Sequence, residues 1–260
     1  MPKIIISLLC LFSPLFLRAE TPEEKGLNIA LEIDRRGKGY EDIKSSLKMI
    51  LKNRSGQETT RSMRSKILEG PQTDGDKTVM IFDHPRDVKG TALLSYSHKK
   101  KADDQWLYLP ALKRIKRISA ANRSGPFMGS EFAYEDISPE EVEKYTYKYI
   151  EDVTIDKKLC FKVERYPTYP KSGYTKQVVY VDSKRYIPLK IDFYDRKKTL
   201  LKTLRFKSYK LYLKKYWRPD LMHMVNLQNR KETRLLFKNY VFKSKLRPSA
   251  FTRNALKRAR

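Results

Sequence analysis

The residues of this sequence that could carry acid–base, nucleophilic or metal chemistry have spacings that support none of these. The histidines are scattered and none lies in HExxH or another ligand-spaced motif (His84, His98 and His223). The acidic pairs fall in expected turns (Asp83-His84 and Asp103-Asp104). The Ser-Gly pairs lack the strand-to-helix setting of a nucleophile elbow (Ser124-Gly125 and Gly129-Ser130). We therefore predict a protein that is not an enzyme and holds no cofactor and no metal.

The two cysteines predict no disulfide. Cys10 lies in an apolar leader, and removal of that leader leaves Cys160 alone. Cys160 stands in the alternating run Leu-Cys-Phe-Lys-Val, which is typical of a strand. We interpret it as a packed, unreactive thiol.

The least generic stretch runs from Gly90 to Asp136. Trp106, Tyr108 and Pro110 alternate with two leucines, so both faces of this strand are expected to be covered. Basic and aliphatic residues follow at Arg114, Ile115, Arg117 and Ile118. We expect these residues at the mouth of the space that this strand lines.

An aromatic loop with Phe127, Met128, Phe132 and Tyr134 closes this stretch, and Gly125 and Gly129 give its backbone freedom. Two interpretations stay open for the loop: a packed cap on one end of a sheet, or a mobile lid over an apolar pocket. The lid hypothesis predicts ligand-binding residues on the strand and the loop, with two arginines as headgroup contacts at the rim. The predicted ligand-binding residues are Trp106, Tyr108, Leu109, Ile115, Phe127, Met128, Phe132 and Tyr134, and the rim residues are Arg114 and Arg117.

The elements that must position these residues are mostly strands. A first helix is predicted from Pro22, capped by Thr21, to Gly37, with Leu27, Ala30, Leu31 and Ile33 as its apolar side. Another is predicted from Ser249 to Lys257, and a capping box predicts a third near residues 138–142. Between them the apolar period is two, as in residues 47–51, 63–67, 159–163 and 189–193.

We count about eleven strands and no composition shift that would mark a second domain, so residues 20–260 are predicted to form one domain. Turns are expected at residues 53–56, 70–71, 195–196 and 218–220. Within residues 199–213 the apolar residues change from even-numbered to odd-numbered positions, which predicts a bulge near Ser208. The predicted fold is mainly β, with one strongly curved antiparallel sheet. Its concave side is either an apolar cavity or a core filled by helices.

The N-terminus predicts export. Lys3 precedes an apolar run to Leu17, and Leu17-Arg18-Ala19 resembles a cleavage site, so residues 1–19 are predicted to be a signal peptide. Charges interrupt every later apolar stretch, which predicts a soluble mature chain. The formal net charge is +26, from 56 Lys and Arg against 30 Asp and Glu. Export and the lack of nucleic-acid-binding motifs argue against nucleic acid as partner, and we expect peripheral contact with anionic membranes.

The central block resembles the outer-membrane lipoprotein-sorting protein family, LolA-like relatives of periplasmic lipoprotein carriers. The resemblance rests on Trp106 to Pro110, Arg114 to Ile118, and Phe127-Met128-Gly129-Ser130 followed by Tyr134-Glu135-Asp136. It implies a half-open β-barrel with a helical lid over a cavity that accepts acyl chains. It also implies a Gram-negative periplasmic location and work beside a transporter of the resistance-nodulation-division class.

From these observations we expect a periplasmic carrier of the acyl chains of a lipid or lipoprotein. The alternative is an adaptor of a lipid-exporting transporter that binds no cargo of its own. No lipidated cysteine is evident, which favours a soluble carrier over a membrane-anchored receptor.

Overall fold

The computed structural model describes residues 19–71 and 73–258, so the predicted signal peptide lies almost wholly outside the described residues. Thirteen strands form one sheet in the order β6-β5-β4-β3-β2-β1-β13-β12-β11-β10-β9-β8-β7, and every neighbouring pair is antiparallel. The strands are β1 (Asp42–Lys52), β2 (Glu58–Leu68), β3 (Lys77–His84), β4 (Ala92–Tyr96), β5 (Asp104–Leu109), β6 (Arg114–Arg117), β7 (Tyr145–Ile155), β8 (Lys158–Pro167), β9 (Tyr174–Asp182), β10 (Pro188–Asp195), β11 (Leu200–Tyr212), β12 (Tyr216–Asn226) and β13 (Glu232–Phe242).

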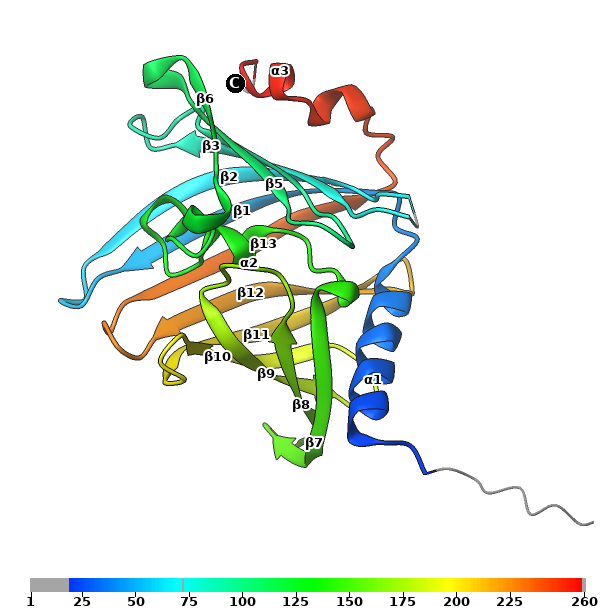
Figure 1. Ribbon diagram of the computed structural model, residues 1–260. Helices are drawn as coiled ribbons and strands as arrows, with labels where there is room; N and C mark the ends of the chain where they lie inside the picture. The colour runs from blue at the N-terminus through cyan, green and yellow to red at the C-terminus, as the bar shows by residue number, and fades with distance from the viewer. Residues whose placement is uncertain (1–18, 72, 259–260) are drawn as a thin grey trace, which may run out of the picture.

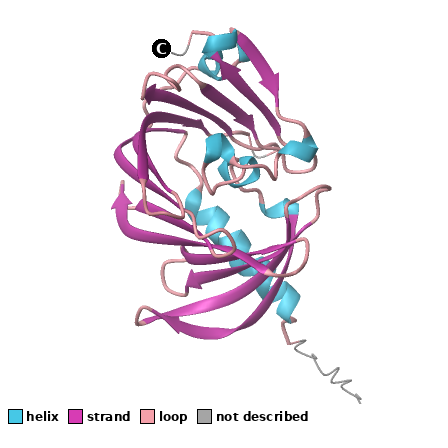
Figure 2. Ribbon diagram, turned by 90° about the vertical axis from the view of Figure 1, so that its left-hand side faces the viewer, coloured by secondary structure: helices cyan, strands magenta, loops and turns pink. Residues whose placement is uncertain are grey.

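The sheet consists of two meanders, β1–β6 and β7–β13, joined where β1 pairs with β13. Strands β6 and β7 are its two edges and do not pair with each other, so the curved sheet remains an open barrel (Figures 1 and 2). The predicted curved antiparallel sheet and half-open barrel are confirmed, with thirteen strands instead of eleven. None of the helices in the part of the chain that the structure describes is long and apolar enough to cross a membrane.

Helix α1 (Pro22–Gly37) covers part of the concave side and packs mainly against β7 (Figure 1). Its start is the predicted one: Thr21 and Glu24 form a capping box, and Pro22 occupies the first turn. The predicted apolar face is partly wrong. Leu27 and Leu31 are exposed, and the helix buries Gly26 and Ile29 instead.

The connection from β6 to β7 turns back across the concave side. It contains the single-turn helices η2 (Ala120–Asn122), η3 (Phe127–Gly129), α2 (Tyr134–Ile137) and η4 (Val142–Lys144). The helix predicted at residues 138–142 is wrong, because Ser138 and Glu141 have extended backbones and only η4 forms a turn. In this segment the Glu141 side chain accepts a hydrogen bond from Ser97, and the Glu140 side chain pairs with Arg165. These tertiary contacts outweigh the local sequence preference for a helix.

Two further sequence predictions on the second meander are wrong. Residues 218–220 lie inside β12, and the turn falls at residues 213–215, where Leu213 and Lys214 have positive φ angles without the glycine that usually marks such a turn. β11 and β12 keep the same register on both sides of Ser208, so no residue is inserted there, although Ser208 itself has no partner in the ladder. Ser208 instead adopts a left-handed φ of 55°.

The C-terminal segment crosses the convex side of β3–β5. The predicted helix from 249 to 257 is split into η5 (Pro248–Phe251) and α3 (Arg253–Leu256), with Thr252 as the N-cap of α3. Phe251 and Leu256 are fully buried against a cluster that contains Val79, Ile81 and Leu94. The Tyr96 hydroxyl donates a hydrogen bond to the Phe251 carbonyl and fixes this segment to β4.

Candidate functional site

A cavity of about 340 Å³ lies between α1 and the concave faces of β8–β12, and we call it the first cavity. This volume falls in the range of sites for small ligands, although near its lower end. Ile29 and Ile33 of α1 form one wall. The opposite wall consists of inward-facing residues of the four neighbouring strands β8–β11: Val163, Val179, Val181, Ile191, Phe193 and Leu204.

Close contact between backbones holds α1 over this cavity. A Cβ atom built on Gly26 would lie 2.8 Å from the backbone nitrogen of Tyr149 and 2.9 Å from that of Lys148. No side chain fits there, so Gly26 lets α1 approach β7 at van der Waals distance. About one and two helical turns further on, Ile29 and Ile33 then reach the cavity.

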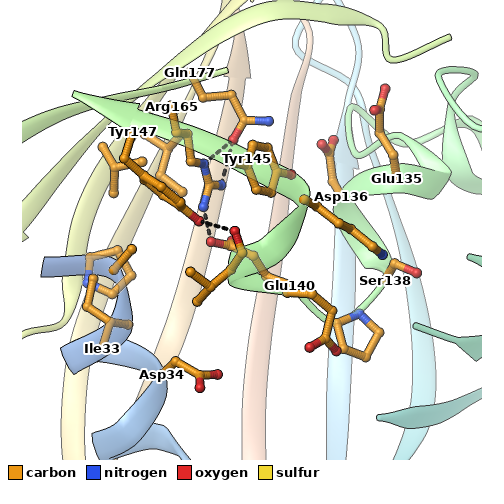
Figure 3. Close-up of a pocket in the computed structure, with 18 of the residues that line it drawn as sticks. Ile33, Asp34, Glu135, Asp136, Ser138, Glu140, Tyr145, Tyr147, Arg165 and Gln177 are labelled. Atoms are coloured by element: carbon orange, nitrogen blue, oxygen red, sulfur yellow. Dashed lines mark hydrogen bonds and ion pairs between the residues drawn. The ribbon is translucent and has the colours of Figure 1, made fainter. Parts of the chain in front are cut away.

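The first cavity has a polar end built around Arg165, a buried residue of β8 (Figure 3). Its Nε donates to the Oε1 of Gln177 at 2.8 Å, its Nη2 donates to the same oxygen at 2.5 Å, and its Nη1 pairs with Glu140. Burial lowers the pKa of Arg165 to about 10, so the guanidinium still carries its charge at neutral pH.

Aromatic rings connect Arg165 to a second buried arginine, Arg123. The Arg165 guanidinium lies 4.6 Å from the Tyr145 ring centroid, and the Tyr145 and Tyr169 rings meet edge to face at 6.0 Å. The Arg123 guanidinium lies 5.8 Å from the Tyr169 centroid. Both arginines therefore lie at the same end of the cavity, separated by a pair of tyrosines.

The carboxylates at the polar end of the first cavity pair with cations or accept hydrogen bonds. Asp136 accepts from the Nζ of Lys202 at 2.7 Å, and Asp103 pairs with Lys144; all four side chains are at least nine-tenths buried. Glu135 accepts hydrogen bonds from the Tyr169 hydroxyl, the Ser172 hydroxyl and the Gly173 backbone. Burial raises the pKa of Glu135, which favours its neutral form.

A second cavity of about 610 Å³ adjoins the first on the same concave side. Four residues line both: Ile33, Pro188, Phe206 and Met222. Its further lining combines five aromatic residues, Tyr186, Tyr209, Trp217, Phe237 and Tyr240, with five basic residues, Arg35, Arg36, Arg185, Lys215 and Arg218. The two cavities therefore meet at Phe206 and Met222, which are paired across β11 and β12.

The aromatic loop predicted from the sequence packs into the filled half of the concave side. Phe127 and Phe132 are completely buried, and Met128 and Tyr134 pack against the same core cluster. Leu109 packs there as well. None of these five residues lines the first or second cavity.

Trp106 and Tyr108 point to the other face of the sheet, into the cluster under the C-terminal segment. The strand is therefore covered on both faces, as predicted. Trp106, Ile115 and Arg117 line a separate pocket of about 770 Å³ together with Arg253 and Lys257 of the C-terminal segment. Arg114 is exposed on β6 and lines none of the three cavities.

The sequence analysis missed the polar end of the first cavity, although a signal for it exists. Arg165 has the same strand parity as Phe161 and Val163, and Gln177 has the parity of Val179 and Val181. A polar residue in the inward phase of an apolar strand marks a polar group directed at the core. Within residues 19–71 and 73–258, no group of three or more His, Cys, Asp or Glu side chains is placed to hold a metal ion.

The fold defines the class of protein. A LolA superfamily protein from Nitrosomonas europaea superposes with a TM-score of 0.70 at 18% identity, covering 88% of this chain and 98% of that one. At this identity the likeness concerns the fold alone, and it confirms the open barrel that the curved sheet and helix α1 form. The molecule is a LolA-like open β-barrel protein.

Two nearer relatives define the family. A domain assigned to outer membrane lipoprotein sorting, from Vibrio parahaemolyticus, is 53% identical, with a TM-score of 0.88 and coverage of 90% of this chain and 99% of that one. A DUF1329 family protein from Desulfovibrio piger is 28% identical, with a TM-score of 0.86 and coverage of 91% and 99%. A family model described only as an uncharacterized protein matches residues 74–258. No curated protein matches significantly. The chain belongs to the outer membrane lipoprotein-sorting protein family that its central block predicted.

Proposed function

We propose that this protein is a non-enzymatic carrier of the bacterial envelope that holds an acyl chain in the two adjoining cavities and shields it from water between membranes. The observation that carries the proposal is the pair of adjoining cavities under α1, which share the apolar lining residues Ile33, Pro188, Phe206 and Met222. The sorting role assigned to the Vibrio parahaemolyticus relative supports a lipid or lipoprotein as cargo.

Burial alone supplies enough affinity for such a carrier. Each methylene removed from water contributes about 0.8 kcal/mol, so about ten methylenes contribute about 8 kcal/mol. Before the entropic cost of association is subtracted, that free energy corresponds to a Kd on the order of 1 μM, so the actual binding is weaker. Binding of this strength holds a chain in water and still releases it to an acceptor membrane or protein.

A basic edge suits contact with an anionic membrane. Residues 105–130 and 233–258 contain no acidic residue, and they contain five and eight Lys or Arg residues respectively. The fold brings part of these segments together where β6 and the C-terminal segment meet: Arg117, Arg253 and Lys257 line one pocket. Each basic residue near an anionic surface contributes about 1 kcal/mol. In this proposal Arg114 and Arg117 contact lipid headgroups at the membrane and not at the rim of the cavity.

Native mass spectrometry of the protein purified without delipidation tests the proposal. We expect the chain to carry a bound lipid mass, and M222W to lose it, because an indole at Met222 blocks the passage between the two cavities. V241W is the matched control, since Val241 is half exposed and lines none of the described cavities. Wild-type protein that is always empty and retains no fatty acid after delipidation would contradict the carrier and favour the adaptor of a resistance-nodulation-division transporter.

A further inference from the structure

Two unpartnered hydrogen-bond donors lie in side chains at the polar end of the first cavity. In the described part of the chain, buried side-chain atoms without a hydrogen-bond partner include Nη2 of Arg123 and the hydroxyl oxygen of Ser138. Both residues line the first cavity. Buried polar groups are nearly always satisfied in folded proteins, so two donors left over at one end of one cavity indicate a missing acceptor.

The charges around these donors leave Arg123 uncompensated. Among the cations that line the first cavity, Lys144 pairs with Asp103 and Arg165 with Glu140, whereas Arg123 forms no ion pair with any described residue. The nearby carboxyl group of Glu135 already accepts three hydrogen bonds, and its burial favours the neutral form. An unpaired guanidinium in a buried site is strongly unfavourable unless an anion joins it.

The carboxylates that could repel such an anion are engaged elsewhere. Asp34 of α1 pairs with Lys38 at 2.8 Å, and Glu141 accepts from the Ser97 hydroxyl at 2.7 Å. Asp136 is neutralised by Lys202. Glu140 is the exception: it bonds Arg165, but its side chain is 53% exposed, so an incoming anion can displace it into water.

We propose that Arg123 and Ser138 form a headgroup subsite for the carboxylate or phosphate at the end of a single-chain amphiphile, and that Arg165 adds its positive charge from beyond the tyrosine pair. Guanidinium groups bind both anions through paired hydrogen bonds. The apolar walls beginning at Val163 and Val179 then receive the chain, which runs toward the second cavity. The inference rests on the proposed function and adds to it the charge of the cargo and its direction of entry, head toward β8.

Competition binding to delipidated full-length protein tests the subsite. The probe is a fluorescent conjugated C18 fatty acid, and the competitors are stearic acid, its methyl ester, and lysophosphatidic acid with the same chain. A charged hydrogen bond contributes roughly 1.5–3 kcal/mol, so the acids should compete roughly ten- to a hundredfold better than the ester. R123M should abolish this preference while still binding the ester, and S138A should reduce it. R54M removes the same charge at an exposed turn and should change nothing.

The outcomes separate the two proposals. Equal binding of acid and ester by the wild type, or an unchanged preference in R123M, overturns the subsite while the carrier function stands. Failure of every ligand to bind, ester included, overturns the carrier function itself. A higher thermal midpoint for R123M supports the subsite, because removing an unpaired buried charge stabilises the empty protein. If R123M does not fold, S138A and R123K are measured in its place. An unchanged preference of S138A for the acid over the methyl ester overturns the subsite. If lysophosphatidic acid competes more strongly than stearic acid, the anion that the subsite prefers is a phosphate and not a carboxylate.

Discussion

Gly26 offers the sharpest test of how α1 covers the cavities. In G26A, the new methyl group would meet backbone atoms of Tyr149 and Lys148 at 2.8–3.0 Å, and backbone atoms cannot rotate aside. Alanine stabilises a helix by about 1 kcal/mol relative to glycine. Overpacking of this kind costs about 1–3 kcal/mol, and retreat of α1 also exposes part of Ile29, whose full burial contributes about 1.5–3 kcal/mol. We therefore expect a net loss of about 1–3 kcal/mol.

The same helix supplies the control. A Cβ atom on Gly37 would meet no heavy atom within 4 Å, so G37A should be neutral or slightly stabilising. For a chain of this size each kcal/mol shifts Tm by roughly 2–4 °C. Thermal unfolding should place G26A clearly below G37A, and hydrogen exchange should show faster exchange confined to α1 and β7. Equal Tm and equal exchange in the two variants would refute the close packing of α1 on β7.

Two further predictions concern the buried charges. K202M should destabilise the fold by about 3–5 kcal/mol in denaturant titrations, because it leaves the buried Asp136 carboxylate without its cation. The control is K210M, which breaks an ion pair with Asp220 whose lysine is exposed and should therefore have little effect. Similar losses of stability in both variants would contradict the prediction. Because burial raises the pKa of Glu135 above its ordinary 4.5, its protonation stabilises the fold at low pH, and this contribution is lost as pH rises through the folded-state pKa. The Tm of the wild type relative to E135Q should therefore fall as pH rises from about 4.5, and a constant difference across that range would exclude Glu135 as the titrating group.

Much of the fold is predictable from local sequence. Alternation in residues 47–51, 63–67 and 189–193 marks true strands, and the Thr21 cap and Pro22 mark the start of α1. The local rules fail where tertiary partners decide. Ser138-Pro139-Glu140-Glu141 has every feature of a helix start, yet its two glutamates reach Arg165 and Ser97, and the backbone stays extended.

The candidate site is harder to predict because it is assembled across distant strands. Arg165 and Arg123 are 42 positions apart in sequence and are brought together through Tyr145 and Tyr169. Aromatic residues suit both a lid and a core, so composition alone does not separate these two roles for the aromatic loop. Only the parity of Arg165 and Gln177 within apolar strands pointed to the cavity.

The hollow follows from a geometric mismatch between the sheet and what covers it. An open sheet of thirteen strands presents a longer concave face than one connection can fill, and it has no second sheet to pack against. The connection from β6 to β7 fills one half with Phe127 and Phe132, while α1 spans the other half and contributes few large side chains. The wall under α1 is nevertheless aliphatic and aromatic, and its end carries an uncompensated arginine. Such a surface is unfavourable when empty and favourable with an acyl chain and an anion in place, which is why a bound amphiphile accounts for both features at once.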